Sequence, residues 1–121
     1  TRGDLDRAEE MFKASLAIFQ KLGHQEGMAR QYGNLGNIYK TRGELDRAEE
    51  MHKKALAIDE KLDRLEGMAS TYGNVGSIAK DRGDIARARD LWIQAHDLFA
   101  KIGMPHQVER VQGWLDGLPR R

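Results

Sequence analysis

The chain of 121 residues has no cysteine, only two prolines and no long apolar run. The absence of cysteine excludes disulfides, thiolate metal sites and cysteine nucleophiles, and it is typical of a reducing compartment, so we expect a cytoplasmic location. No apolar stretch approaches the roughly 20 residues that span a bilayer. No signal-peptide pattern opens the chain. Because Thr1 is not an initiator Met, we expect the chain to be a piece of a longer protein.

Neither sign of charge is in clear excess, since 20 Lys and Arg residues stand beside 19 Asp and Glu residues. This balance gives no reason to expect nucleic acid or an anionic membrane as a partner. Apolar residues make up 40% of the chain and charged residues 32%. That mixture is typical of a helical protein with a large surface.

The main feature that is present is an internal repeat of 40 residues. Residues 1–40 and 41–80 agree at 26 of 40 positions, whereas residues 81–120 agree with the first block at 11. Divergence at one end is typical of a capping unit, whose outer face meets water. We therefore expect a single array over residues 1–121, which contains the second helix of a truncated repeat (1–23), two repeats (24–63 and 64–103) and a C-terminal capping helix (104–121).

Apolar residues recur at helical spacing through the whole chain and predict about six helices. The predicted ranges are 4–22, 25–42, 44–62, 65–82, 84–102 and a sixth helix that begins at Pro105. We expect Gly23, Gly43, Gly83 and Gly103 to end helices, because glycine adopts the left-handed conformation readily. Short connections force neighbouring helices to run antiparallel. No segment alternates with a period of two, so we expect an all-α fold without strands.

The residues at the centre of this repeat resemble the tetratricopeptide repeat (TPR). The matching positions are Leu35, Gly36, Tyr39, Gly43, Ala48 and Ala55, then Val75, Gly76, Ala79, Gly83, Ala88 and Ala95, with Gly3, Ala8 and Ser15 at the front. Ala79 and Ser15 depart from the pattern. Phe12 and Trp92 fill its large aromatic position, from which His52 departs.

The repeat is longer than the common TPR period of about 34 residues, and it is similar to the long repeats of Pins-type adaptors, kinesin light chains and bacterial regulators. The resemblance covers about residues 1–104. It implies a right-handed α-solenoid of antiparallel helix hairpins that binds another polypeptide. It implies neither an enzyme nor a cofactor.

Two glycines stand in the middle of predicted helices, where each costs roughly 1 kcal/mol relative to alanine. We expect Gly36 and Gly76 to lie where two helix backbones approach too closely for a Cβ atom, and Ala48 and Ala88 to face them. The string from Gly33 to Gly36 lacks the strand and the spacing of a phosphate-binding loop.

No constellation indicates catalysis or metal binding. The four histidines (His24, His52, His96 and His106) form no ligand pair, and we expect each to be solvated or locally hydrogen-bonded. No serine stands on a recognisable nucleophile turn. The carboxylates recur as Glu49-Glu50 and Asp59-Glu60, which we expect on exposed faces of second helices.

The candidate binding residues form a polar stripe on the first helix of each hairpin, the helix that lines the concave side in stacked hairpins of this kind. Each set shares one helix face. The sets are Arg30, Asn34, Asn37 and Thr41 with Lys40; Ser70, Asn74, Ser77 and Asp81 with Lys80; and Arg110, Trp114, Gly117 and Arg121 with Arg120.

Two interpretations of this stripe remain open. The amides of Asn34 and Asn74 can pair with the backbone of a bound peptide, and Arg30, Arg110 and Lys40 can hold carboxylates of an acidic segment. Alternatively, the two amides bond only to neighbouring helices and set the stacking. Trp114 fits the packing of an end cap better than binding.

Two functions therefore follow from the sequence. The first is a protein-interaction scaffold that binds a partner peptide in its concave groove. The alternative is a structural segment that self-associates end to end through an uncovered N-terminal helix. The apolar residues on that helix are Leu5, Met11, Phe12, Leu16 and Phe19.

Overall fold

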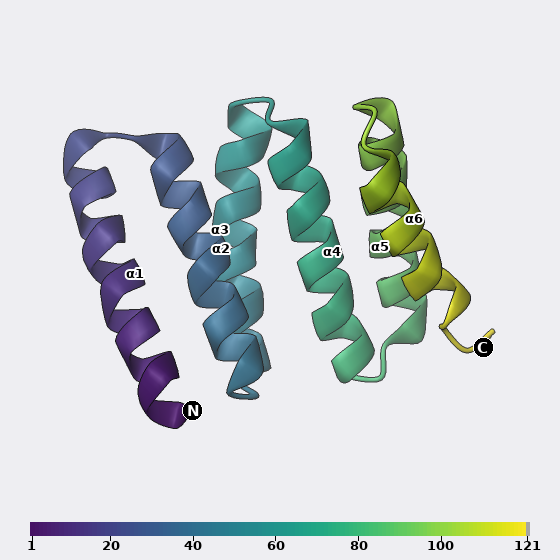
Figure 1. The fold of residues 1–121 in the computed structure, drawn as a ribbon, viewed down its shortest axis with the longest axis horizontal. Coiled ribbons are helices and arrows are strands. Elements are labelled where there is room, and N and C mark those ends of the chain that lie inside the picture. Colours follow the sequence, from purple (N-terminus) through teal and green to yellow (C-terminus); the bar gives the residue numbers. More distant parts are fainter. Residues whose placement is uncertain (121) are drawn as a thin grey trace. The chain divides into compact units, whose positions relative to one another are not determined.

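Six α-helices follow one another in the computed structural model, which describes residues 1–120 (Figure 1). They are α1 (Arg2–Leu22), α2 (Gln25–Thr41), α3 (Leu45–Lys61), α4 (Leu65–Asp81), α5 (Ile85–Lys101) and α6 (Pro105–Asp116). The part of the chain that is described contains no strand. Arg121, which the sequence placed in the polar stripe, lies outside the described residues.

Helix α1 begins two residues before its predicted start because Thr1 caps it. The Thr1 hydroxyl accepts a hydrogen bond from the Asp4 amide at 3.2 Å, and the Asp4 carboxylate accepts one from the Thr1 amine at 3.3 Å. This reciprocal pairing satisfies amides that the first turn would otherwise leave without partners.

The helices end at the predicted glycines, with one exception. Gly43 and Gly83 both have φ of 83°, which confirms the predicted left-handed turns. Between α3 and α4 the same role falls to Asp63, at φ 55°. Aspartate tolerates this conformation better than most residues, because its short side chain can hydrogen-bond locally.

The described chain divides into two compact units. In the first, residues 1–61, α2 contacts both α1 and α3 (Figure 1). In the second, from residue 62 onward, α5 contacts both α4 and α6. The core of the second unit consists of Ala69, Trp92, Ala95, Phe99, Val111 and Leu118.

The expectation for Gly36 and Gly76 was right about close approach but wrong about the partner. A Cβ atom on Gly36 would lie 2.6 Å from the His52 ring, and one on Gly76 would lie 2.4 Å from the Trp92 ring. Each glycine therefore makes room for a large ring of the second helix rather than for a helix backbone. Ala48 and Ala88 are fully buried, but their atoms are not the nearest ones to a Cβ atom on Gly36 or Gly76.

Two further expectations about polar residues were wrong. His52 is fully buried, and neither ring nitrogen has a hydrogen-bond partner among the described residues. It therefore fills the aromatic position of the repeat instead of departing from it. Asp59, expected on an exposed face, is only 4% exposed. Periodicity placed both residues on helices correctly, but it could not show how deeply the neighbouring elements bury them.

The other three histidines are as expected. His24 accepts a hydrogen bond from the Gly27 amide at 2.9 Å through Nδ1 and so caps α2. The Nδ1 atom of His96 lies 3.2 Å from the Asp97 carboxylate. His106 is exposed.

A polar network (Asp6, Glu9, Lys13, Tyr39 and Arg42) joins α1 to α2 in the first unit. The Glu9 carboxylate accepts hydrogen bonds from the Tyr39 hydroxyl at 2.8 Å, from Arg42 and from Lys13 at 2.8 Å. Arg42 also donates to Asp6. The hydrogen bonds from Lys13, Arg42 and Tyr39 lower the pKa of Glu9 to about 2, while burial opposes this shift.

Candidate functional site

Four of the predicted stripe residues meet in one small cleft of the second unit. The cleft has a volume of about 150 Å³ and lies between α4 and α6. Its lining residues are Ala69, Ser70, Gly73, Asn74, Phe99, Gln107, Arg110 and Trp114. Ser70, Asn74, Arg110 and Trp114 were predicted from the sequence.

The floor of this cleft is apolar and its rim is polar. Ala69 and Phe99 belong to the buried core, with 0% and 5% exposure. Helical spacing places Ser70 and Asn74 one turn apart on α4, and Arg110 and Trp114 one turn apart on α6. A side chain that entered the cleft would therefore meet carbon atoms below and hydrogen-bonding groups at the edge.

Trp114 gives the cleft a rigid aromatic wall. Its ring centroid lies 5.5 Å from that of Trp92 at an interplanar angle of 43°, a favourable tilted arrangement. The indole of Trp92 donates to the carbonyl of Gly73 at 3.0 Å, which holds that ring in turn. Trp114 thus packs against the core, as the sequence favoured, and it also lines the cleft.

Arg110 stands at the rim with its charge available. Its guanidinium lies 5.4 Å from the centre of the Trp114 ring, within the range of a cation–π interaction. Within residues 1–120 no carboxylate lies at ion-pair distance from it. A guanidinium so placed can donate two parallel hydrogen bonds to a carboxylate brought by a ligand.

Neither stripe asparagine bonds to a neighbouring helix. Asn34 donates to the Gln31 side chain of its own helix at 3.4 Å. Asn74 is half-buried, and its side chain has no hydrogen-bond partner among the described residues. Among the described residues, neither amide therefore makes the bond to a neighbouring helix that the stacking interpretation required.

The remaining predicted residues lie outside the cleft. Ser77 donates to the Gly73 carbonyl of its own helix at 3.2 Å, and Lys80 is exposed on the next turn of α4. The stripe on α2 belongs to the first unit and consists of Arg30, Asn34, Asn37, Lys40 and Thr41.

Some of the α2 stripe residues already have partners. Arg30 pairs with Glu26 at 3.7 Å, and Thr41 donates to the Asn37 carbonyl at 3.0 Å. Such back-bonding to the same helix is common for threonine. The hydroxyl of Thr41 is therefore less available to a ligand than the sequence suggested.

Gln107 is the cleft residue with hydrogen-bonding capacity that sequence reasoning missed. It lies on α6 three residues before Arg110 and seven before Trp114, so it shares their helix face. That spacing was the available signal. Gln107 stands in the first turn of α6, one turn before the positions that align with the stripe on α2.

No helix among the described residues is both long and apolar enough to cross a membrane. Nor does any group of His, Asp and Glu side chains in residues 1–120 have an arrangement that could hold a metal ion.

Comparison with known proteins identifies the repeat. Residues 1–61, the whole of the first unit, match the family model of the tetratricopeptide repeat. No curated protein matches the chain.

Two solved structures have the same fold. The crystal structure of BtubC (BKLC) from P. vanneervenii is 23% identical with a TM-score of 0.64, over 98% of this chain and 62% of that one. A putative kinesin light chain from Podosopora anserina with nearly identical TPR-like repeats is 20% identical with a TM-score of 0.69, over 91% and 58%. The chain thus spans less than two thirds of either protein. The predicted all-α solenoid class of helix hairpins is confirmed.

Proposed function

Because the chain belongs to the tetratricopeptide repeat family, we propose that it binds an extended segment of a partner protein in the α4–α6 cleft. Repeats of this family generally mediate protein–protein interactions, so the proposed role is binding rather than catalysis. The cytoplasmic location expected from the composition likewise remains a proposal.

The observation that carries this proposal is a pair of polar side chains at the cleft, Asn74 and Arg110, that have no hydrogen-bond or ion-pair partner within residues 1–120. Asn74 offers both a donor and an acceptor to a peptide backbone. Arg110 offers a guanidinium that no carboxylate in residues 1–120 neutralises. The cleft volume of 150 Å³ has room for about five water molecules, or for one side chain of moderate size.

The charge at the rim favours an acidic ligand. Arg110 lies at the cleft and Lys80 is exposed on the same stripe of α4. We propose that a glutamate or aspartate of the partner places its carboxylate on Arg110 while its methylene groups contact Trp114. Neighbouring peptide groups of the partner then pair with Asn74.

The test measures binding of a peptide library to the chain and to two double variants. We expect Asn74→Ala with Arg110→Ala to weaken binding of the selected peptides by about tenfold or more, since hydrogen bonds to charged groups contribute about 1.5–3 kcal/mol. Asn34→Ala with Asn74→Ala tests the two amides. Arg7→Ala, which removes an exposed arginine of α1, is the matched control. Undiminished binding in both double variants would contradict the proposal.

Self-association is a second candidate function, favoured by the exposed apolar residues of α1. Met11, Ile18 and Leu22 are 69%, 59% and 71% exposed. Of the residues predicted to be uncovered, Met11 is exposed, whereas Leu5, Phe12, Leu16 and Phe19 are half-buried. Exposed apolar side chains on one helix drive association. Sedimentation velocity over a wide range of concentrations tests this, and a persistent monomer would remove it.

A further inference from the structure

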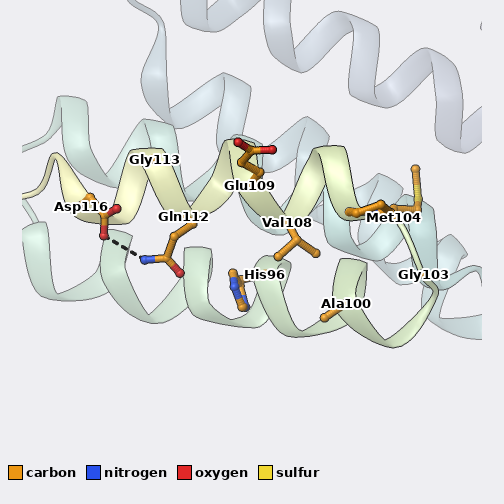
Figure 2. Close-up of a pocket in the computed structure, with 10 residues that line it drawn as sticks. His96, Ala100, Gly103, Met104, Val108, Glu109, Gln112, Gly113 and Asp116 are labelled. Carbon is orange, nitrogen blue, oxygen red and sulfur yellow. Dashed lines mark hydrogen bonds between the residues drawn. The ribbon is translucent and has the colours of Figure 1, made fainter.

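A second and larger hollow lies along α5 and α6, with a volume of about 740 Å³ (Figure 2). Ala100 and Val108 form part of its apolar floor, and Met104 lies at one end. In Figure 2, His96 lies between α5 and α6, whereas Glu109 lies at the edge of α6 and is directed away from α5. The full lining is His96, Ala100, Gly103, Met104, Pro105, Val108, Glu109, Gln112, Gly113 and Asp116, and we call it the α5–α6 groove.

This groove is separate from the cleft described above. An α-helix has about 3.6 residues per turn, so Glu109, Gln112 and Asp116 share one face of α6. Arg110 and Trp114, which line the cleft, lie on the opposite face. A ligand can therefore occupy either place without touching the other.

The groove is acidic. Its lining contains two carboxylates and no lysine or arginine, although the chain as a whole is nearly neutral. Asp116 accepts a hydrogen bond from the Gln112 side chain at 2.8 Å. Glu109 is exposed and has no ion-pair partner within residues 1–120. These charges would attract a cationic partner.

The two carboxylates stand where the other first helices carry small residues. Glu109 corresponds to Ala29 and Ala69, which are 4% and 0% exposed. Asp116 corresponds to the two glycines, Gly36 and Gly76, that receive the His52 and Trp92 rings. If a further repeat helix packed on α6 as α3 packs on α2, a ring at the position of His52 or Trp92 would meet the Asp116 side chain. The groove therefore fits a helix that presents a cation, not an aromatic ring, at this point.

We propose that the α5–α6 groove binds a basic amphipathic helix of a partner protein. Glu109 and Asp116 are seven residues apart, about 10 Å along α6. A helix lying beside α6 would place lysine or arginine at positions i and i+7 against these two carboxylates. Val108, Ala100 and Met104 lie on the other side of Glu109 from Asp116, so an apolar stripe at i−3 and i−4 of the bound helix would lie on them. Such burial of an apolar helix face in a groove is a general mode of peptide recognition.

The experiment uses the 121-residue chain and a synthetic helical peptide of about 20 residues with leucines in one stripe and lysines two turns apart. Binding is followed by fluorescence anisotropy, and methyl NMR locates it through the signals of Met104 and Val108. We expect saturable binding that shifts both methyl signals and weakens with added salt. A peptide with glutamate in place of the two lysines should not bind.

Charge-removing variants test the role of the carboxylates. Glu109→Gln with Asp116→Asn should weaken binding about tenfold, because two exposed ion pairs are lost. Glu60→Gln with Asp90→Asn removes one exposed glutamate and one exposed aspartate elsewhere and should have no effect. Arg110→Ala should also leave this binding unchanged, which separates its outcome from that of the proposed function.

Several results would overturn the proposal. These are no binding of the lysine peptide, equal binding of the glutamate peptide, or shifts confined to residues 1–61. A dimer of the chain that Glu109→Gln with Asp116→Asn abolishes would make a second copy the occupant and would equally count against it.

Discussion

A single ring position distinguishes the repeats at the scale of residues. It is occupied by Phe12 in α1, His52 in α3 and Trp92 in α5. Trp92 has a hydrogen bond for its indole nitrogen, whereas both nitrogens of His52 lack a partner among the described residues. Burial, together with the charge of Lys40, lowers the pKa of His52 to about 4.

The first prediction is an acid-sensitive first unit. As pH falls below about 6.5, His52 becomes protonated in the unfolded chain. In the folded chain it stays neutral until pH reaches about 4. The free energy of unfolding is therefore unaffected by His52 above pH 6.5. It decreases by about 3 kcal/mol in total as pH falls from 6.5 to 4. Urea unfolding between pH 7.5 and pH 4.5 measures this loss.

Two variants separate His52 from the other titrating groups. His52→Phe, which copies the residue of α1, should abolish most of the pH dependence in this window. His106→Gln changes an exposed histidine and should leave the pH dependence of stability unchanged. If His52→Phe retained the dependence of the parent chain, the assignment to His52 would be wrong.

The second prediction concerns two glycines of the same helix. Gly36→Ala should destabilise the first unit by about 1–3 kcal/mol, because the new methyl group would lie 2.6 Å from the His52 ring. Gly33→Ala meets nothing within 4 Å and should stabilise it by about 0.5–1 kcal/mol through higher helix propensity. Chemical denaturation measures the change in the free energy of unfolding for each variant. If both substitutions changed the stability in the same direction, the His52 ring would not be the reason that position 36 requires glycine.

At the scale of elements, α1 is held against α2 by polar as well as apolar contacts. Glu9 is 15% exposed and accepts hydrogen bonds from three side chains, two of which lie at the end of α2. Its lowered pKa means that this contribution persists at mildly acid pH. It disappears only as pH falls from about 4.5 toward 2. The Glu9 and His52 effects therefore occupy different pH windows.

The third prediction is that Glu9→Gln loosens α1. Loss of the charged acceptor should cost about 1–2 kcal/mol and should increase amide hydrogen exchange in α1 more than in α3. Glu10→Gln changes the neighbouring exposed glutamate and serves as the matched control. Equal exchange rates in the two variants would contradict a special role for Glu9.

At the scale of the whole molecule, the acid-sensitive residue and the fluorescent reporters belong to different units. His52 lies in residues 1–61, and the two tryptophans of the chain, Trp92 and Trp114, lie in the second unit. Tryptophan fluorescence therefore reports on the second unit, while helical circular dichroism reports on both. Differences between the two signals reveal whether unfolding is two-state.

The fourth prediction is that the two probes separate in acid. At pH 5 we expect circular dichroism to show an early loss of helix in urea, before the tryptophan signal changes. The separation should narrow at pH 7.5 and should vanish at pH 5 in His52→Phe. Coincident curves for the parent chain at pH 5 would mean that the array unfolds as one cooperative body.

The sequence by itself determined the six helices, their turns and the fold class. Hydrophobic spacing and helix-ending glycines are local signals, and the 40-residue recurrence repeats them. It also grouped Ser70 with Asn74 and Arg110 with Trp114 on shared helix faces, because a shared face follows from spacing alone.

Only the tertiary structure decided which of these residues meet and what each glycine faces. Depth of burial depends on neighbours that are distant in sequence, so the burial of His52 and Asp59 could not be predicted without the packed helices. The same holds for Glu109 and Asp116. Their place on α6 follows from spacing, but the groove that they line exists only because α5 packs beside α6.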